Sequence, residues 1–417
     1  MISPEVVLFI ILIIISVEYL LDTYLEFINI KNQNPVLPPA LAEIYDQEKY
    51  QKSLSYHNTT TRFGLFTSSL SFAVSFLLLY TGAFGAIDEW LRQFFQNEII
   101  LALAFFGLLY LASDILTIPF QIYSVFGIEE KYGFNKTTPK TFVVDKLKGY
   151  LLTIIFGGLI ISLLLWLILS IGQEFWVYFW IAIAAFLLFV NMFYASLIVP
   201  IFNKLTPLEE GSLKEKIKRY SLSVSFPLDN IFVIDGSKRS SKSNAFFSGI
   251  GKKKKIVLYD TLIQNHTEEE LVAILAHEVG HYKKKHIFAS FLISILHVGI
   301  MLYVMSLMIF SPVLSHALGG NITSIPLNLI AFGILYSPLS KILGILMNVI
   351  SRKNEYEADA YAANTFNGNF LQEALKKLSV NNLSNLMPHK LYVFFHYSHP
   401  PLLQRLKALN QVKEPTT

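Results

Sequence analysis

Apolar and polar residues alternate along this chain in long blocks. Seven blocks are apolar over 16 to 28 residues, and about 20 apolar residues in a helix cross the hydrocarbon core of a bilayer. The predicted spans are residues 6–21, 63–86, 99–126, 150–171, 175–202, 287–310 and 327–350. No basic residue precedes the first block and no small-residue cleavage site follows it, so we expect a retained span rather than a secretory signal.

This pattern divides the chain into membrane-embedded and soluble parts. Residues 1–202 hold spans one to five with their loops, and residues 287–350 hold spans six and seven. The polar segments 203–286 and 351–417 are expected on one side of the membrane, where they can form one split domain. We therefore predict an α-helical multi-pass membrane protein with a small soluble domain.

The first polar segment also predicts a small β-sheet. Residues 229–235, 244–248 and 255–259 are short runs rich in β-branched and aromatic residues. The edge of such a sheet can hold an extended peptide through main-chain hydrogen bonds. Strands with a purely packing role fit the sequence equally well.

Composition and charge narrow the class of protein. The chain is 53% hydrophobic and 15% charged, and it has no Cys, which excludes disulfides, thiolate metal ligands and cysteine-protease chemistry. Of its 34 Lys and Arg residues, 32 lie in the loops after spans one, three and five and after span seven. The positive-inside rule then predicts an N-terminus outside and both polar segments in the cytoplasm. The net charge of +4 follows from this bias, so we expect no nucleic-acid partner.

The motif at residues 277–281 gives the first indication of chemistry. On a helix, His277 and His281 project from one face, and each can donate a ring nitrogen to Zn²⁺. Glu278 lies beside them, within reach of an attacking water. The alternative is an amphipathic helix whose histidines meet other polar groups.

The residues around this motif favour a helix. Thr267 and Glu270 form the pattern of a capping box, and an apolar run without Gly or Pro follows. Gly280 lowers helix stability by roughly 1 kcal/mol relative to Ala, which indicates that another element packs closely there.

A catalytic zinc site uses three protein ligands and keeps a fourth position open, so one ligand is still missing. In residues 351–360, Glu355 and Asp359 share a helix face, while Glu357 points away. We predict Glu355 as the third ligand and Asp359 as a carboxylate that orients a metal-bound imidazole. The alternative is a helix start with ordinary solvated acids.

A second cluster of polar residues lies near the C-terminus. His399 and Arg405 could donate hydrogen bonds to an oxyanion and to substrate carbonyls. On these residues alone, His396 could serve in place of His399, and a surface turn followed by a basic helix is equally compatible.

With these motifs, the chain resembles the type I CAAX prenyl proteases, which are integral-membrane zinc endopeptidases. The matching segments are residues 127–138, 244–247, 260–262, 277–281, 355–359 and 399–401, with Arg405. The resemblance implies seven membrane helices around an intramembrane chamber, with the zinc site at its cytoplasmic end. Lys341, in the middle of span seven, is expected to face that chamber, because a charge at bilayer depth costs roughly 2.5 to 3.5 kcal/mol.

The resemblance also implies roles around the metal. His277, His281 and Glu355 would hold one Zn²⁺ per chain. Glu278 would be the general base, and Asp359 would support a zinc ligand from behind.

Further roles concern the substrate. Asn244, Ala245 and Phe246 would bind the substrate backbone. His399 and Arg405 would stabilise the reacting carbonyl, which places His399 above His396 as the candidate.

We therefore expect a zinc-dependent membrane endopeptidase. The resemblance implies that it removes the last three residues of prenylated CAAX proteins. One alternative is a quality-control protease for misfolded or stalled membrane proteins, and another is a transporter or channel with a structural zinc. The expected partners are a peptide or protein substrate and the lipid bilayer. We expect a monomer in a bacterial inner membrane or, in a eukaryote, in the ER membrane.

Overall fold

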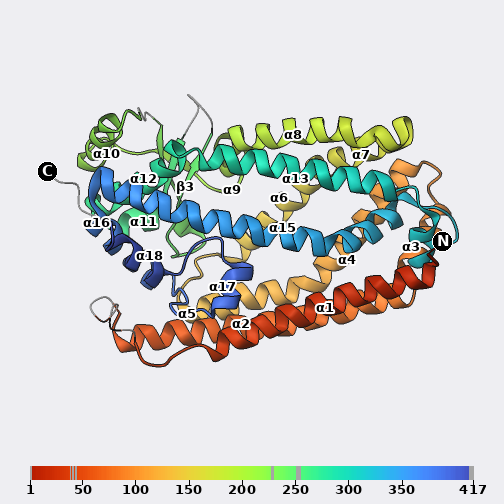
Figure 1. Cartoon of the computed structure of the whole chain (residues 1–417), viewed down its shortest axis with the longest axis horizontal. Coiled ribbons are helices and arrows are strands. Elements are labelled where there is room, and N and C mark those ends of the chain that lie inside the picture. The colour runs from red at the N-terminus through yellow and green to blue at the C-terminus, as the bar shows by residue number, and fades with distance from the viewer. Residues whose placement is uncertain are drawn as a thin grey trace.

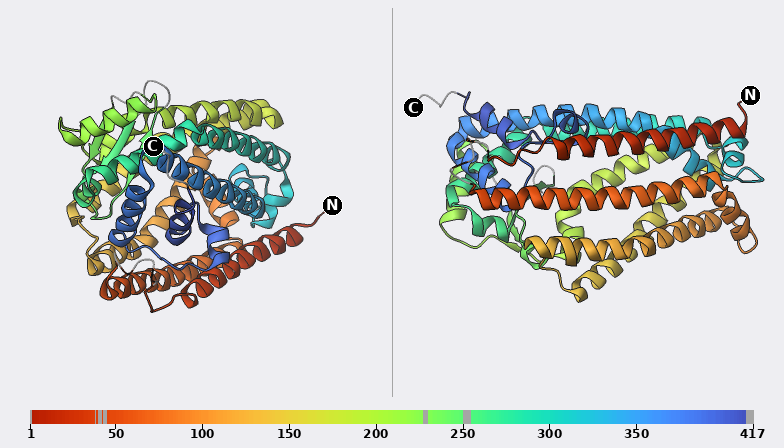
Figure 2. Two further views of the ribbon diagram at one scale, coloured as in Figure 1. Left: turned by 60° about the vertical axis from the view of Figure 1, so that its left-hand side comes forward. Right: turned by 90° about the horizontal axis from the view of Figure 1, so that it is seen from below.

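The computed structural model describes residues 2–37, 39, 42, 45–226, 230–249 and 255–412. Its long helices lie side by side, and the sheet lies at one end (Figure 1). The N-terminus lies at the opposite end, as the right-hand view of Figure 2 also shows. The molecule is thus a helical bundle with a soluble domain at one end.

The predicted multi-pass helical fold is confirmed. Among the described residues, six helical stretches are long and apolar enough to cross a membrane. One of them, Pro139–Phe202, has 64 residues and is divided by a 3-10 turn at Gly172–Glu174, so it accounts for predicted spans four and five. The long helices are α1 (Pro4–Lys31), α2 (Gln47–Tyr80), α4 (Glu98–Ile122), α7 (Gly158–Ile171), α8 (Phe175–Phe193), α13 (His286–Met308) and α15 (Ile325–Ala362).

Shorter helices connect and cap the bundle. They are α3 (Ala83–Arg92), α5 (Glu130–Tyr132), α6 (Pro139–Leu152), α9 (Val199–Phe202), α10 (Ser212–Ser223), α11 (Asp260–Asn265), α12 (Glu268–Lys283), α14 (Pro312–Ala317), α16 (Gly368–Asn381), α17 (Lys390–His396) and α18 (Leu402–Leu409). The sheet lies at one end together with α10, α11, α12, α16 and α18, whereas α3 lies at the other end (Figure 1). Helix α12 carries the motif at 277–281, and it packs against α10, α15 and α16.

The sheet has four strands in the order β1-β2-β4-β3, which are β1 (Leu205–Pro207), β2 (Ile231–Ile234), β3 (Ala245–Ser248) and β4 (Lys255–Tyr259). The three predicted strands are present, although β2 begins at Ile231 and Asp229 lies outside the described residues. Strand β3 pairs antiparallel with β4, and within the described part of the chain it pairs with no other strand. It therefore leaves one edge of the sheet open.

Helix α15 crosses the predicted boundary between residues 350 and 351 without a break. The seventh span and Glu355 are therefore parts of one helix of 38 residues. The division of the chain into four segments stays a prediction.

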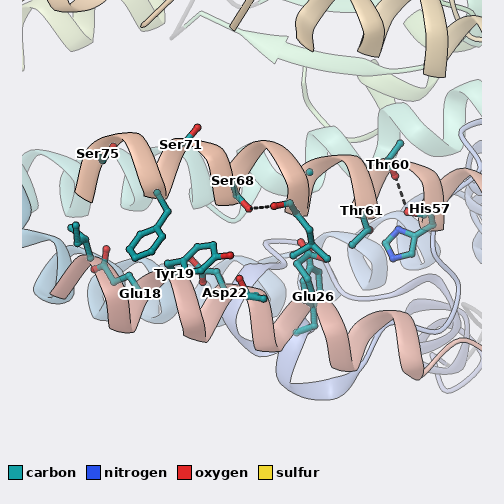
Figure 3. A pocket seen from close by; sticks show the side chains of 16 residues that line it. Glu18, Tyr19, Asp22, Glu26, His57, Thr60, Thr61, Ser68, Ser71 and Ser75 are labelled. Carbon is teal, nitrogen blue, oxygen red and sulfur yellow. Dashed lines mark hydrogen bonds between the residues drawn. The ribbon is translucent and has the colours of Figure 1, made fainter. Parts of the chain in front are cut away.

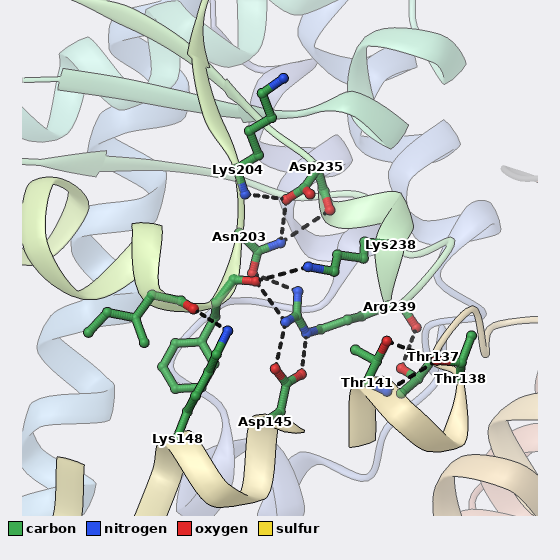
Figure 4. Close-up of polar contacts among 12 residues, drawn as sticks. Thr137, Thr138, Thr141, Asp145, Lys148, Asn203, Lys204, Asp235, Lys238 and Arg239 are labelled. Atoms are coloured by element: carbon green, nitrogen blue, oxygen red, sulfur yellow. Dashed lines mark hydrogen bonds and ion pairs between the residues drawn. The ribbon is translucent and has the colours of Figure 1, made fainter. Parts of the chain in front are cut away.

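Arg239 anchors the sheet to the membrane helices (Figure 4). Its Nε and Nη2 donate to the carboxylate of Asp145 on α6, at 2.7 and 2.8 Å. Its Nη1 donates to Asn203 Oδ1 at 3.0 Å, and Asn203 in turn donates to Asp235, just after β2. This network holds the soluble domain against spans four and five.

A cavity of about 700 Å³ lies between α1 and α2. Its lining includes Glu18, Asp22 and Glu26, which follow one another along α1 (Figure 3). The Lys341 ammonium donates to Asp22 at 2.8 Å, so the charge in the middle of span seven is paired beside this cavity.

Candidate metal centre

Helix α12 starts with the predicted capping box, which is confirmed. The Thr267 hydroxyl accepts from the Glu270 N–H at 3.3 Å, and the Glu270 carboxylate accepts from the Thr267 N–H at 2.9 Å. Glu270 also pairs with Lys377 of α16 at 2.6 Å. The buried apolar residues of α12 belong to the core of the soluble domain, so both the start and the face of the helix are fixed.

His277, His281 and Glu355 converge on one point, where they form the group of described residues that could hold a metal ion. His277 Nε2 and His281 Nε2 lie 3.2 Å apart, and these atoms lie 3.5 and 3.2 Å from Glu355 Oε2 and Oε1. Ligand atoms about 2.05 Å from a tetrahedral Zn²⁺ lie about 3.3 Å from one another. The three side chains therefore have the spacing of a zinc site.

The Glu355 carboxylate gives a second indication of a metal site. Its Oε2 is buried and accepts no hydrogen bond from the described residues. A buried carboxylate oxygen without a hydrogen bond is costly, and a bound cation reduces that cost. The donor set of two imidazoles and one carboxylate suits Zn²⁺.

Gly280 allows α12 and α15 to approach closely. A Cβ added at Gly280 would lie 3.1 Å from both the Ala358 Cα and the Tyr361 Cβ. The close neighbour expected from the sequence is therefore α15, the helix that carries Glu355.

Asp359 supports His277 from behind. Its Oδ1 lies 2.8 Å from His277 Nδ1, and Asp359 also accepts two hydrogen bonds from Arg405, at 2.6 and 2.8 Å. Arg405 Nη1 lies 3.4 Å from Glu355 Oε2. Asp359 is 1% exposed, so this pair of charges is buried directly behind the metal ligands.

The structure separates the two candidate histidines near the C-terminus. His399 Nε2 lies 3.4 Å from Glu355 Oε1, and its side chain is 65% exposed, which leaves it accessible to a substrate. His396 instead packs against Tyr392, with the two rings tilted by 44°, and lies 4.0 Å from Asp22 of α1. His399 is therefore near the metal ligands, and His396 is turned toward α1.

A third histidine, which the sequence did not single out, lies beside His281. His286 Nδ1 is 3.2 Å from His281 Nδ1, and His286 Nε2 is 3.2 Å from Glu357 Oε2. A ligand that binds a metal through Nε2 carries its proton on Nδ1, so His281 would donate to His286. Periodicity could not reveal this contact, because the chain leaves the helix between the two histidines, at Lys285 with φ +61°.

Two side chains of the motif, His281 and Glu278, differ in their surroundings. Burial lowers the pKa of His281, but its hydrogen bond with Glu355 and the negative charges of Glu355 and Glu278 together outweigh burial, so the resulting pKa is raised. Glu278 is half-buried, and its carboxylate forms no hydrogen bond or ion pair with the described residues. A carboxylate without a partner beside a metal site can accept a proton from water.

Strand β3 lies close to this site. A cavity of about 590 Å³ is lined by His281 and His286 together with Phe247 and Ser248 of β3. Asn244 is exposed, and its side-chain oxygen accepts from the N–H of the next residue. The predicted substrate residues Ala245 and Phe246 are thus on the open edge strand, which Asn244 directly precedes, and Phe247 and Ser248 of the same strand line the cavity.

Comparisons with known proteins cover almost the whole chain. Residues 26–204 match the family described as CAAX prenyl protease N-terminal, five membrane helices, and residues 207–413 match peptidase family M48. A CAAX prenyl protease 1 homolog of Arabidopsis thaliana is 36% identical over 94% of this chain and 95% of its own length. CAAX prenyl protease 1 of Saccharomyces cerevisiae is 35% identical over 91% of this chain and 89% of its own. The crystal structure of S. mikatae Ste24p superposes with a TM-score of 0.91 at 33% identity, over 97% of this chain and 99% of that one.

Proposed function

The chain belongs to peptidase family M48, as a multi-pass membrane metalloendopeptidase, and we propose that it uses one Zn²⁺ to cleave prenylated CAAX proteins. The observation that carries the metal assignment is the convergence of His277, His281 and Glu355 at tetrahedral spacing. Relatives that match over most of this chain are named CAAX prenyl proteases, which supports the substrate class. All three ligands come from one chain, in keeping with a monomer.

The number of ligands argues for catalysis. A structural zinc site is closed by four protein ligands, whereas a catalytic site has three and keeps one position open. His277, His281 and Glu355 are three, and the unpaired Glu278 lies next to them. A transporter with a structural zinc would need neither the open position nor Glu278.

A bound Zn²⁺ supplies a Lewis acid that polarises a peptide carbonyl and lowers the pKa of water. Glu278 takes a proton from the attacking water, whose oxygen bonds to the carbonyl carbon. As the C–N bond breaks, Glu278 passes that proton to the leaving amine. His399 faces the side open to substrate and stabilises the negative charge that develops on the carbonyl oxygen, and Arg405, buried behind the ligands, adds its positive charge from there.

Other residues keep the ligands in place. Asp359 accepts a hydrogen bond from Nδ1 of His277. His286, whose other ring nitrogen contacts Glu357, accepts one from Nδ1 of His281. Both contacts leave Nε2 of the ligand histidine for the metal. Arg405 balances the buried charge of Asp359.

The open edge of β3 suits an extended peptide. Ala245 and Phe246 lie on that edge strand, Asn244 directly precedes it, and Phe247 and Ser248 line the cavity that contains His281. We therefore assign the substrate backbone to β3 and its scissile bond to the metal end of the cavity.

The side of the membrane on which the metal centre lies follows from the distribution of Lys and Arg residues. The loops that contain 32 of the 34 Lys and Arg residues follow spans one, three, five and seven. By the positive-inside rule, the metal centre faces the cytoplasm.

The experiment that tests this function measures zinc content and cleavage of a farnesylated CAAX peptide in detergent. Wild type and Glu278→Gln should both retain zinc, and the variant should lose at least about 100-fold in kcat. Glu269→Gln, on the same helix and paired with Lys216 away from the site, is the matched control and should cleave as the wild type does. Zinc without cleavage in the wild type would exclude the prenylated substrate and leave unprenylated membrane proteins, as a quality-control protease would take.

A further inference from the structure

Three consecutive lysines stand where α12 ends and the sixth span begins. Lys283 is the last residue of α12, and α13 starts at His286. All three lysines are exposed, and within the described residues none of them forms an ion pair. Lys283 donates to the main-chain oxygen of Ser225 at 3.1 Å, which fixes its side chain without neutralising its charge.

An apolar cavity of about 420 Å³ lies beside these lysines. We call it the span-six cavity. Its wall includes Tyr282, Ile287, Phe288 and Phe291, and Lys283 and Lys285 also line it. Phe288 is 60% exposed although it belongs to a membrane-spanning helix, so its ring is available to lipid.

We propose that the span-six cavity binds one anionic phospholipid. Lys283 and Lys285 contact its phosphate, and an acyl chain lies on Phe288 and Phe291. A lysine at the end of a span places its charged group at the level of the lipid head groups, where it attracts anionic lipid. Lys284, which does not line the cavity, takes no part.

The charge decides between lipids. A zwitterionic lipid offers the two lysines no net negative charge, and an isoprenoid chain offers none at all. Either one would fill the aromatic wall but leave both ammonium groups without a counter-ion. An anionic phospholipid covers the aromatic wall with its acyl chain and gives both lysines a counter-ion with its phosphate.

The bound lipid would lie directly behind the catalytic cavity. Asn191, Phe247, Ile287 and Phe291 line both the span-six cavity and the cavity that contains His281. Helices α8 and α13, which supply part of this shared wall, lie side by side (Figure 1).

Native mass spectrometry of the full-length protein in detergent tests this site, with phosphatidylglycerol and phosphatidylcholine titrated separately. Lys283→Gln/Lys285→Gln should weaken phosphatidylglycerol binding about 30-fold and leave phosphatidylcholine binding unchanged. The matched control, Lys284→Gln/Lys407→Gln, also removes two exposed charges and should bind as the wild type does. Phe288→Asn should weaken binding through the acyl chain. Unchanged zinc content and thermal midpoint establish that each variant is folded.

Three results would overturn the proposal. Equal weakening in the two double variants would mean that the attraction comes from overall charge. Equal affinity of the wild type for both lipids would remove the anionic requirement. Displacement of phosphatidylglycerol by a farnesylated peptide would assign the cavity to the substrate chain instead.

Discussion

Gly280 lies against Ala358 so closely that an added Cβ would be only 3.1 Å from the Ala358 Cα. This contact sets the distance between the helix that carries two metal ligands and the helix that carries the third. Backbone packing between α12 and α15 therefore determines the geometry of the metal centre.

A larger residue at Gly280 should push the two helices apart. We expect Gly280→Val to cost about 1 to 3 kcal/mol in stability and to abolish zinc retention through dialysis, because overpacking there cannot be relieved by a flexible side chain. Zinc content and thermal midpoint measure both effects. Gly344→Val on α15, where nothing lies within 4 Å of an added Cβ, is the control and should retain zinc. Full zinc content in Gly280→Val would contradict this account.

Asp359 and Arg405 form a buried pair, so removal of one charge should cost more than removal of both. Asp359→Asn leaves Arg405 buried without its counter-charge, and we expect a loss of about 3 to 5 kcal/mol in stability. The double variant Asp359→Asn/Arg405→Met should be less destabilised than Asp359→Asn alone. Glu210→Gln, from an exposed ion pair, should change stability by less than about 1 kcal/mol. Additive losses in the double variant would show that the two charges do not interact.

His286 should affect zinc affinity through His281. His286→Ala removes the acceptor for His281 Nδ1, and zinc binding should weaken about 10- to 100-fold. His286→Asn carries an amide close to the former Nδ1 and should recover part of that affinity, which a purely structural role would not explain. A competition titration with a zinc-selective dye measures the dissociation constants. Lys353→Gln, which removes the other ionic partner of Glu357, is the control and should bind zinc normally.

His399 should influence turnover without influencing the metal. His399→Ala removes an exposed donor near the substrate side, and we expect kcat to fall about 100- to 1,000-fold with zinc content unchanged. His396→Ala serves as the matched control, because that imidazole packs against Tyr392 and is turned toward α1. If the two variants lost equal activity, the assignment of His399 to the reacting carbonyl would be wrong.

Metal removal should inactivate the enzyme reversibly and leave it folded. Helix α12 is held by an apolar core and by its capping box, neither of which needs a metal. Chelation should therefore abolish cleavage and lower the thermal midpoint, while the helical circular dichroism signal persists and added Zn²⁺ restores activity. Loss of the helical signal on chelation would mean that the metal holds the fold together.

Local patterns in the sequence predicted much of this site. His277 with His281 and Glu355 with Asp359 follow helical spacing, and the capping box at Thr267 uses a spacing of three residues. Hydrophobic length alone predicted the spans. Such features depend on neighbours along one helix, so the sequence shows them directly.

Contacts across a helix break or between distant segments were not predictable. His286 reaches His281 only because the chain turns at Lys285, and no period links the two residues. The choice of His399 over His396 came from family resemblance, since it depends on how α17 and the following turn pack against α15. Strand β1 has only three residues, too few to form a recognisable pattern.

The continuity of α15 has a mechanical consequence. One continuous helix passes through the hydrophobic layer and also carries Glu355, so a change in the tilt of that helix displaces a metal ligand relative to α12. Tilt responds to the thickness of the surrounding bilayer. The thickness of the membrane therefore affects the geometry of the metal centre. Cleavage rates measured in short-chain and long-chain lipids should differ even when substrate, metal and pH are the same.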